Sequence, residues 1–506
     1  MHCCIPTIYD LRSTIYDLAM ASIEEIRAER LRKLELLKSR GVDPYPSKVP
    51  RDYALSEIRE RFSVLEAKKK LVALVGRVMA IRGQGAIQFV VLNDGTATFQ
   101  AVFKRDVLGE EQMDFFSEVA DIGDFIGVSG ELLVTQRGEE SIMATSWSMA
   151  AKSLLPLPEK WHGLQDPEEK LRKRYLDILF DPELRELFIK KSKFWNAIRS
   201  FMLAEGFLEV ETPVIENTTG GADAKPFATH HNALDIDVYL RISAGELWQK
   251  RLMVAGYPKV FEIGRIFRNE GMSPEHAQDY TQLEFYWSYA NYEDGMMLVE
   301  RMYKHVAQET FGTLKFTIHD HEVDLGGEWA RYDYAETIKK MTGIDIESSS
   351  VSIRTDISEK LNSLGVQHDP SDNFPRLVDT LWKYCRKQLS GPGFLVNVPA
   401  FMSPLAKRSA NVTTVEQFQP IIAGSEVGKG YSELNDPIDQ AVRFQEQQRM
   451  RDAGDAEAQM YDHDFVEALE HGMPPTCGFG VSERFFAFLA NRPIREAQLF
   501  PLMKPK

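Results

Sequence analysis

Short segments with a hydrophobic period of two, between residues 71 and 104, restrict the fold of this chain more than any other feature. The segments span 71–82, 86–93 and 97–104. They are separated by Gly-Gln-Gly at 83–85 and by Asn-Asp-Gly at 93–95. Both are strong β-hairpin signals, because these residues tolerate the positive φ of tight turns. The pattern therefore predicts three consecutive antiparallel strands.

Two further strands are predicted near 124–135 and 141–148, and the segment GEEQMDFFSEVA at 109–120 predicts a helix before them. Five strands with a helix between the third and the fourth match the OB-fold, a small barrel that often binds oligonucleotides. We therefore expect an OB-fold β-barrel domain over residues 66–155.

The residues before this barrel have a helical pattern instead of the strand pattern. Residues 20–65 predict a helical segment, whose first helix begins with a capping box of Ser22 and Glu25 and carries six lysine and arginine side chains. A charged helix face of this kind is usually solvated. Residues 1–19 contain TIYDL twice, and we expect translation to begin at Met20 and this leader to be non-functional.

Residues 156–170, PLPEKWHGLQDPEEK, predict a linker to a second domain over 171–506. There a long amphipathic helix precedes a strand at 207–215, strands return in later segments, and a small helical insertion lies near 335–390. The pattern is α+β, with an antiparallel β-sheet flanked by helices rather than β-α-β repeats. Rossmann and P-loop phosphate motifs do not occur in the sequence, so those nucleotide sites are not expected.

The charge balance limits the partners of such a chain. Its 60 lysine and arginine residues face 75 aspartate and glutamate residues, a net charge of −15, so a nucleic acid must meet a local basic patch. No apolar run approaches the ~20 residues of a membrane span, and we expect no membrane partner. The four cysteines form no C-x-x-C pair, which favours a cytoplasmic location.

Residues 265–289, RIFRNEGMSPEHAQDYTQLEFYWSY, combine arginines, carboxylates, a histidine and aromatic rings in one strand–loop–strand. A loop that served only to turn would use Gly, Pro and Asn. The composition predicts a bound ligand that is both charged and planar. A surface hairpin with a salt bridge is the alternative.

Three separated segments resemble the motifs of class II aminoacyl-tRNA synthetases. FLEVETPVI with Pro213 is similar to motif 1, Phe267-Arg268-Asn269-Glu270 to motif 2, and GFGVSERFFAFL with Arg484 to motif 3. Further segments resemble the lysyl branch of subclass IIb: RYLDIL, THHNALDIDVYLRIS, SPLAK, GYSELND and LFPLMKP. The resemblance covers residues 20–506. It implies a class II catalytic domain that activates L-lysine with ATP and transfers it to the 3′ end of tRNA(Lys).

The resemblance also implies how ATP is used. No protein nucleophile is needed, so catalysis consists of positioning and of neutralising phosphate charge. The catalytic Arg268 would bridge the amino-acid carboxylate and the α-phosphate, and the catalytic Arg484 would cover one adenine face and reach the terminal phosphates. The implied ATP-binding residues are Arg268, Glu270, His276, Tyr280, Glu426 and Arg484.

A lysine pocket needs a carboxylate for the ε-ammonium, because an unpaired buried charge costs on the order of several kcal/mol. The resemblance gives this role to Glu433, with the Tyr286 hydroxyl beside it. A glutamate there would repel aspartate, the substrate of a related synthetase. The implied lysine-binding residues are Gly221, Glu246, Arg268, Glu284, Tyr286 and Glu433.

In the barrel, the resemblance implies an anticodon site formed by Phe89, Gln100 and Glu139. A ring can stack on a uracil, and amide or carboxylate groups can read base edges. Phe89 alternates with Gln88, so a core position for its ring is the alternative. Positive charge for the phosphates is offered by Lys68, Lys69, Lys70, Arg77 and Arg82.

The magnesium site departs from the family. The family would have two glutamates as Mg²⁺ ligands in TVEQFQPIIAGSEVGKGYSELND, whereas this chain has Gln419 in the first position and keeps Glu426. An amide is a poorer ligand for a hard cation, and Glu416 would lie on the opposite face of the strand. Lys429 replaces the usual asparagine, and we expect its charge to substitute for one Mg²⁺. The alternative is that Lys429 points to solvent and ATP carries its own magnesium.

Motif 1 implies a two-fold interface, so a homodimer is expected. One alternative function is a catalytically inactive tRNA-binding or regulatory protein of the same fold, which would be expected to lose Arg268 or Arg484. Another is an aspartyl or asparaginyl enzyme of subclass IIb.

Overall fold

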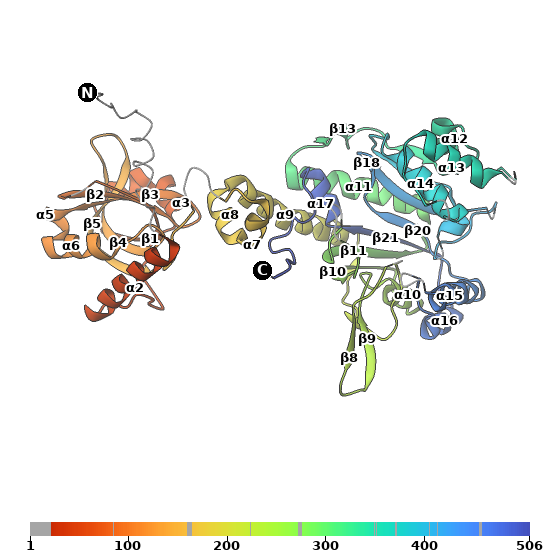
Figure 1. Cartoon of the computed structure of the whole chain (residues 1–506), viewed down its shortest axis with the longest axis horizontal. Helices are drawn as coiled ribbons and strands as arrows, with labels where there is room; N and C mark the ends of the chain where they lie inside the picture. The colour runs from red at the N-terminus through yellow and green to blue at the C-terminus, as the bar shows by residue number, and fades with distance from the viewer. Residues whose placement is uncertain are drawn as a thin grey trace, which may run out of the picture. The chain divides into compact units, whose positions relative to one another are not determined.

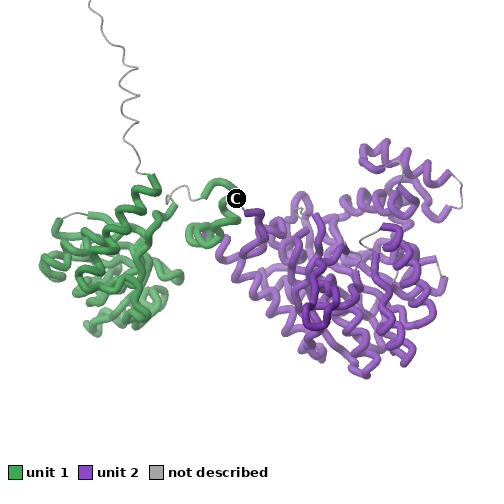
Figure 2. The backbone as a smooth tube through the Cα atoms, turned by 60° about the horizontal axis from the view of Figure 1, so that its bottom comes forward, with its two compact units in different colours: residues 1–180 green, residues 181–506 purple. Residues whose placement is uncertain are grey.

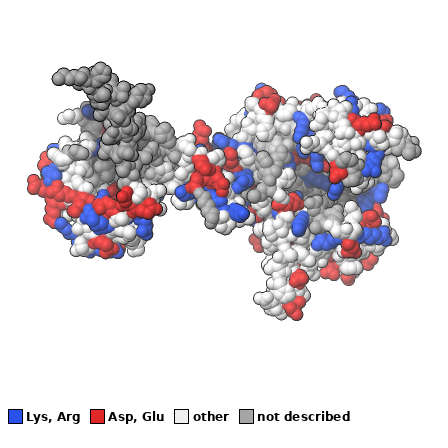
Figure 3. Space-filling view, in the orientation of Figure 1, with Lys and Arg blue, Asp and Glu red and all other residues white. Residues whose placement is uncertain are grey.

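The structure is a computed structural model that describes residues 22–505, with gaps at 84, 159–163, 223, 272–275, 349, 351, 370–371, 404, 412 and 455–457. The expected leader and part of the expected linker lie outside the described residues. The chain forms two compact units, residues 1–180 and 181–506 (Figure 2). Among the described residues, no helix is both long and apolar enough to cross a membrane. Acidic and basic side chains are interspersed over the visible faces of both units (Figure 3).

The first unit is built around a closed barrel with the strand order β1-β2-β3-β5-β4 (Figure 1). Leu74, Val90 and Phe103 point into it and are fully buried, since successive side chains of a strand face opposite sides. Helices lie between β3 and β4 in the chain, so the predicted OB-fold is confirmed. The strands are β1 Val72–Arg82, β2 Ile87–Asn93, β3 Thr98–Lys104, β4 Phe125–Val134 and β5 Glu140–Ala151. The helices are α2 Ile23–Ser39, α3 Leu55–Glu60, α4 Phe62–Glu66, α5 Arg105–Leu108 and α6 Glu110–Val119.

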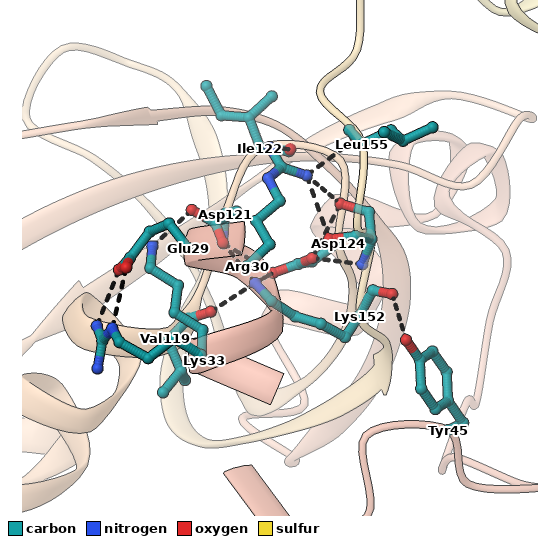
Figure 4. Close-up of polar contacts among 12 residues, drawn as sticks. Glu29, Arg30, Lys33, Tyr45, Val119, Asp121, Ile122, Asp124, Lys152 and Leu155 are labelled. Atoms are coloured by element: carbon teal, nitrogen blue, oxygen red, sulfur yellow. Dashed lines mark hydrogen bonds and ion pairs between the residues drawn. The ribbon is translucent and has the colours of Figure 1, made fainter. Parts of the chain in front are cut away.

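A buried ion network fastens helix α2 to the barrel (Figure 4). Lys152, directly after β5, donates to the buried carboxylate of Asp124 at 2.8 Å. Lys33 of α2 pairs with Asp121 at 2.7 Å, and Arg30 of the same helix is buried and donates to three backbone carbonyl groups of the barrel's loops. The expectation of a solvated basic face is therefore wrong for Arg30 and Lys33, which anchor the helix.

The predicted linker ends earlier than expected. Its last residues begin helix α7 Pro167–Arg172, which is followed by α8 Arg174–Phe180. Asp166 caps α7 by accepting from the backbone N–H groups of Glu168 and Glu169. Proline suits the first position of a helix, where an N–H would have no partner within the helix.

The second unit is built on a sheet with the order β14-β15-β18-β20-β21-β11-β10-β6 (Figure 1). The pairs from β15 to β10 are antiparallel and the two edge pairs are parallel. The predicted α+β class with an antiparallel sheet is confirmed. Phe285 and Phe418 of the sheet share a core with Phe194 of α9 and Tyr303 of α11. The elements are β10 Lys259–Phe267, β11 Asp279–Ser288, β14 Ala330–Asp333, β15 Gly393–Val396, β18 Gln417–Ile422, β19 Ser425–Glu426, β20 Lys429–Ser432, β21 Thr476–Ser482, α9 Pro182–Ala204, α11 Tyr292–Phe311 and α17 Arg484–Leu489.

The strand predicted at 207–215 is broken into β6 Leu208–Glu209, which pairs with β10, and β7 Ile215–Glu216, which pairs with β9. Pro213 lies between the two pieces and has no N–H to donate to a ladder. Thr212 donates its N–H to the carboxylate of Glu262 at 3.0 Å instead of to a strand. The chain therefore changes its partner strand at this proline.

The helical insertion consists of three short helices that lie together at one end of the unit (Figure 1). They are α12 Tyr334–Thr342, α13 Ile353–Ser363 and α14 Phe374–Arg386. The ring of Trp382 on α14 stacks on that of Tyr334, with centroids 4.9 Å apart. The remaining elements are β8 Ala228–His231, β9 Ile236–Leu240, β12 Lys315–Ile318, β13 His321–Asp324, β16 Val398–Pro399, β17 Thr414–Val415, α10 Glu246–Val254, α15 Pro437–Asp452, α16 His463–Glu470 and a 3-10 turn Ala400–Met402.

Candidate active site

A cavity of about 390 Å³ lies against the central sheet of the second unit. Strands β11, β20 and β21 contribute to its walls, together with helix α10 and the start of α17, so segments far apart in the sequence meet there. It brings together every residue that the sequence analysis placed around ATP, lysine or magnesium. These are Gly221, Glu246, Arg268, Glu270, His276, Tyr280, Glu284, Tyr286, Gln419, Glu426, Lys429, Glu433 and Arg484.

Arg268 follows the last residue of β10 and is held by the hairpin to β11. Its backbone N–H donates to the carbonyl of Gln278 at 2.7 Å, and its side-chain Nε donates to the carbonyl of Ile242 at 3.3 Å. The guanidinium carbon lies 5.8 Å from the ring centroid of Tyr280. Burial raises the pKa of the Tyr280 hydroxyl, so the ring is neutral at physiological pH. The pair combines a fixed charge with a flat surface.

Arg484 is the first residue of α17 and is separated from the end of β21 by Glu483 alone. Its backbone N–H donates to Ser482 Oγ at 3.3 Å. The preceding Glu483 is fully buried and pairs with Lys191 of α9 at 2.9 Å, which fixes the start of the helix. His276 is exposed where it lines the cavity.

The most buried part of the cavity is acidic. Glu433 is only 2% exposed. At Gly478 an added Cβ would collide with Oε1 of Glu433 and with the Tyr286 ring, so the glycine leaves room for both side chains. Burial raises the pKa of the Glu433 carboxyl, and the nearby charge of Lys250 opposes this shift.

A second buried carboxylate, Glu284 on β11, is held by three donors. Its Oε1 accepts from the backbone N–H of Ala244 at 2.8 Å and from Gln282 Nε2 at 2.6 Å, and its Oε2 accepts from the Tyr286 hydroxyl at 3.2 Å. Burial, followed by repulsion from Glu246, raises the pKa of the Glu284 carboxyl. The pocket therefore favours a cationic ligand, because a nearby positive charge would lower the pKa of these carboxyl groups and stabilise their ionised form.

Glu426, the candidate magnesium ligand, lies on β19 and is half-buried. Its Oε1 accepts from the indole N–H of Trp382 at 2.7 Å and lies 3.9 Å from Nε of Arg386. Both partners belong to α14. The helical insertion therefore contacts this carboxylate directly.

Gln419 and Lys429 lie beside each other on neighbouring strands. The register of β18 and β20 pairs Phe418 with Gly430, so Gln419 and Lys429 are the next residues of the two strands, and both line the cavity. Within the described part of the chain, no group of three His, Cys, Asp or Glu side chains could hold a metal. The carboxylate of Glu426 is a suitable ligand for Mg²⁺, whereas the neutral amide of Gln419 is a poorer one.

In the barrel, Phe89 and Gln100 share the outer face. The register pairs Val91 with Gln100, and Phe89 lies two residues from Val91 on the same strand. Phe89 is half-buried, whereas Gln88 is buried, so the alternative that placed the Phe89 ring in the core is wrong. Gln100 Nε2 donates to Ser141 Oγ at 2.9 Å.

Glu139 is exposed, two residues before Ser141, on the loop that enters β5. It therefore lies close to Gln100 and can belong to the same surface.

Arg77, which the sequence analysis listed as positive charge for the phosphates, does not contribute to this surface. Its guanidinium lies 4.2 Å from the Phe125 ring centroid and donates to the Gly123 carbonyl at 3.3 Å, so its charge serves the barrel itself.

Residues 166–504 match the family described as tRNA synthetases class II (D, K and N), and residues 72–150 match the OB-fold nucleic acid binding domain. The first match covers more than half of the chain and includes the whole cavity lining. The chain belongs to the class II tRNA synthetases. The second match coincides with the strands of the barrel.

Relatives resemble this synthetase along nearly its whole length. The lysine–tRNA ligase of Thermotoga maritima is 42% identical over 491 residues, which are 96% of this chain and 97% of the relative. That of Moorella thermoacetica is 43% identical over 486 residues, 95% and 98% of the two chains. That of Pelotomaculum thermopropionicum is 42% identical over 488 residues, 96% of each chain.

The sequence analysis missed several residues at the synthetase's site, among them Lys250, Trp382 and Arg386. Lys250 pairs with Glu246 at 2.7 Å, and its spacing of four residues on a helix is a signal that could have suggested the pair. Trp382 and Arg386 also lie four residues apart, but their partner Glu426 is on a distant strand, and nothing in their own segment points to it.

Proposed function

We propose that the synthetase is a lysine–tRNA ligase. In the first step a carboxylate oxygen of L-lysine attacks the α-phosphorus of ATP, the bond from that phosphorus to pyrophosphate breaks, and lysyl-adenylate forms. In the second step a hydroxyl at the 3′ end of tRNA(Lys) attacks the lysyl carbonyl carbon, and AMP leaves. Neither step needs a protein nucleophile, so the side chains position the reactants and neutralise charge.

The proposed ATP site uses the two arginines of the cavity. Arg268 binds the lysine carboxylate and the α-phosphate, and Arg484 covers one face of the adenine opposite Tyr280. Glu270 accepts from the adenine amine, and His276 lies near the phosphates. A guanidinium and a ring on the two faces of a base suit a planar, charged nucleotide.

The observation that carries the choice of lysine is the set of three buried carboxylates, Glu246, Glu284 and Glu433. In the proposal Glu433, with the Tyr286 hydroxyl, binds the ε-ammonium. Glu246 and Glu284 hold the α-ammonium, and Gly221 lies against the same pocket. Aspartate would meet repulsion from Glu433, and asparagine would bring no side-chain cation to this acidic pocket.

The proposal includes ATP-bound Mg²⁺, with Glu426 as its main protein ligand and Lys429 in place of a second ion. Magnesium would neutralise phosphate charge and orient the leaving pyrophosphate. The chain itself contributes the carboxylate of Glu426, which accepts a hydrogen bond from Trp382, whereas Gln419 is neutral. The support is the geometry of these side chains at one wall of the cavity.

The barrel is proposed to bind the anticodon of tRNA(Lys), with stacking on Phe89 and polar contacts to Gln100 and Glu139. Their place on one outer surface supports this role. Lys68, Lys69, Lys70 and Arg82 can supply positive charge for the phosphates.

A homodimer in the cytoplasm is part of the same proposal. Leu208, Val214 and Ile215 of the motif 1 segment are 48%, 42% and 53% exposed, and a second copy would cover these apolar side chains. The described cysteines, Cys385 and Cys477, are unpaired, in keeping with a reducing compartment.

The deciding experiment is amino-acid-dependent exchange of pyrophosphate into ATP, with each of the twenty amino acids tested separately. We expect exchange with lysine alone. Exchange with aspartate or asparagine would favour another member of the family. Binding of tRNA without exchange would favour a catalytically inactive protein.

A further inference from the structure

Lys250 places an ammonium group behind the acidic end of the cavity, against the lining residues Glu246 and Glu433. It lies on α10, one turn after Glu246, and is only 1% exposed. Its Nζ is 2.7 Å from Oε1 of Glu246 and 2.5 Å from Oε2 of Glu433. The rings of Tyr286, Tyr431 and Phe465 surround it, with centroids 5.6 to 5.9 Å from the nitrogen. The cation is therefore enclosed by protein.

This ammonium joins the two carboxylates that serve opposite ends of the proposed substrate. Glu246 also accepts from the Tyr431 hydroxyl at 2.6 Å, on the same oxygen that pairs with Lys250. The other oxygen, Oε2, faces Gly221, where an added Cβ would come within 3.0 Å. Lys250 and Tyr431 thus hold one oxygen of Glu246 and orient the other toward the glycine wall of the cavity.

The count of buried charges explains why a cation is useful here. Three buried carboxylates, of Glu246, Glu284 and Glu433, share the single ammonium of Lys250. No second cation among the residues that the structure describes pairs with them, so two of the three lack a positive charge of their own. The neighbouring buried pair of Arg241 and Glu262 balances itself at 2.5 Å. A diamino acid brings two ammonium groups and makes the pocket neutral, whereas a monoamino acid leaves one buried carboxylate unpaired.

We propose that Lys250 is a positioning residue that makes the pocket selective for a diamino acid, because its fixed ammonium neutralises one of three buried carboxylates and leaves two for the substrate. It acts through Glu246 and Glu433. This inference rests on the proposed function and adds a determinant of its specificity.

The groups around Lys250 set the expected response to pH. Glu246 and Glu433 are its partners, Tyr286 and Tyr431 contribute hydroxyl groups, and Glu284 lies behind Tyr286. On the side of α16, Asp462 is already paired with Arg251 at 2.9 Å. Tyrosines at this depth stay neutral, since burial raises the pKa of the Tyr431 and Tyr286 hydroxyls far above their ordinary values.

Removing the Lys250 charge would therefore act on the carboxylates. Burial raises the pKa of Glu433, and the positive charge of Lys250 lowers it, so loss of that charge would raise the pKa further. A larger fraction of Glu433 would then be protonated at neutral pH, and a neutral carboxylic acid cannot pair with the substrate's ammonium. The resulting defect grows as the pH falls and shrinks as it rises.

The test is lysine-dependent pyrophosphate exchange, measured from pH 6 to 9 for wild type, Lys250→Met and Lys250→Arg. The matched control is Lys304→Met on α11, which breaks another pair of Glu and Lys four residues apart, Glu300 with Lys304, away from the cavity. For Lys250→Met we expect the KM for lysine at pH 7 to rise roughly tenfold with little change in kcat. We also expect the acid limb of kcat/KM to move up by about one pH unit.

Lys250→Arg should keep the acid limb in place because it keeps the charge, and Lys304→Met should match wild type. A defect of Lys250→Met that is equal at every pH would mean that the side chain only packs, and would overturn the inference. If thermal melting shows that Lys250→Met does not fold, the same pH profile is measured for Lys250→Gln, which remains polar but uncharged. The position of its acid limb of kcat/KM then decides. Absence of lysine-dependent exchange in wild type would instead refute the proposed function.

Discussion

Trp382 of the helical insertion donates its indole N–H to Glu426 Oε1 at 2.7 Å. Glu426 is the one carboxylate left in the candidate magnesium site, since Gln419 occupies the other position. A donor from a separate helix therefore orients that carboxylate, and the insertion contacts the cavity lining through Glu426.

The first prediction is that Trp382→Phe raises the magnesium concentration needed for half-maximal pyrophosphate exchange. A hydrogen bond to a charged group contributes about 1.5–3 kcal/mol, so we expect a requirement raised roughly tenfold. Tyr334→Phe is the matched control, because it changes the ring stacked on Trp382 and leaves the indole donor in place. Equal magnesium curves for both variants would show that the hydrogen bond does not serve the metal.

The second prediction concerns lysine selection. Glu433→Gln keeps the shape of the side chain but removes the charge that pairs with the ε-ammonium, and we expect a loss of about 2–5 kcal/mol in kcat/KM for lysine. The control is Glu416→Gln, a half-buried carboxylate outside the cavity lining. Unchanged kinetics with lysine for Glu433→Gln would place the side-chain pocket elsewhere.

The third prediction separates the two units. Phe89→Ala should reduce aminoacylation of tRNA(Lys) and leave lysine-dependent pyrophosphate exchange near the wild-type rate, because the first step does not involve the barrel. Phe99→Ala is the comparison, since Phe99 is a core residue of the same barrel at 2% exposure. It should lower the melting temperature, whereas Phe89→Ala should lower it little. Parallel loss of both activities in Phe89→Ala would contradict a role in tRNA binding.

The fourth prediction tests the charge of Lys429 as a substitute for magnesium. Lys429→Asn should need more magnesium for pyrophosphate exchange, because it removes a positive charge beside Gln419. The double change Gln419→Glu with Lys429→Asn should restore the wild-type magnesium requirement, since it supplies a second carboxylate ligand. Identical magnesium curves for wild type and both variants would mean that Lys429 only faces solvent.

The fifth prediction concerns assembly. Ile215→Glu puts a charge into the exposed apolar surface of motif 1, and we expect it to shift the protein from dimer to monomer in light scattering. Ile438→Glu, at an exposed isoleucine of α15, should leave the mass unchanged. A wild-type protein that is fully active and monomeric would refute the dimer.

The barrel strands could be predicted from sequence because tight turns fix their ends locally. The residues of the cavity could be named because the resemblance to a known family carried them, although no pattern in the chain shows by itself that Gly221 and Glu433 line the same cavity. Other features depend on distant partners. The strand breaks at Pro213 because the segments before and after it pair with different strands, β10 and β9. Arg30 is buried because the loops of the barrel present carbonyl groups to it.

The ion network around Lys152 also determines where the barrel could be cut from the rest of the chain. A fragment limited to residues 72–150, the segment that matches the OB-fold family, would lose Lys152 together with Arg30 and Lys33 of α2. Asp124 would then lose the cation that pairs with its carboxylate, and breaking such an ion pair by removing one partner is destabilising. An isolated anticodon-binding module should therefore begin before α2 and end beyond Leu155, so that the contacts of Arg30, Lys33 and Lys152 with the barrel are kept.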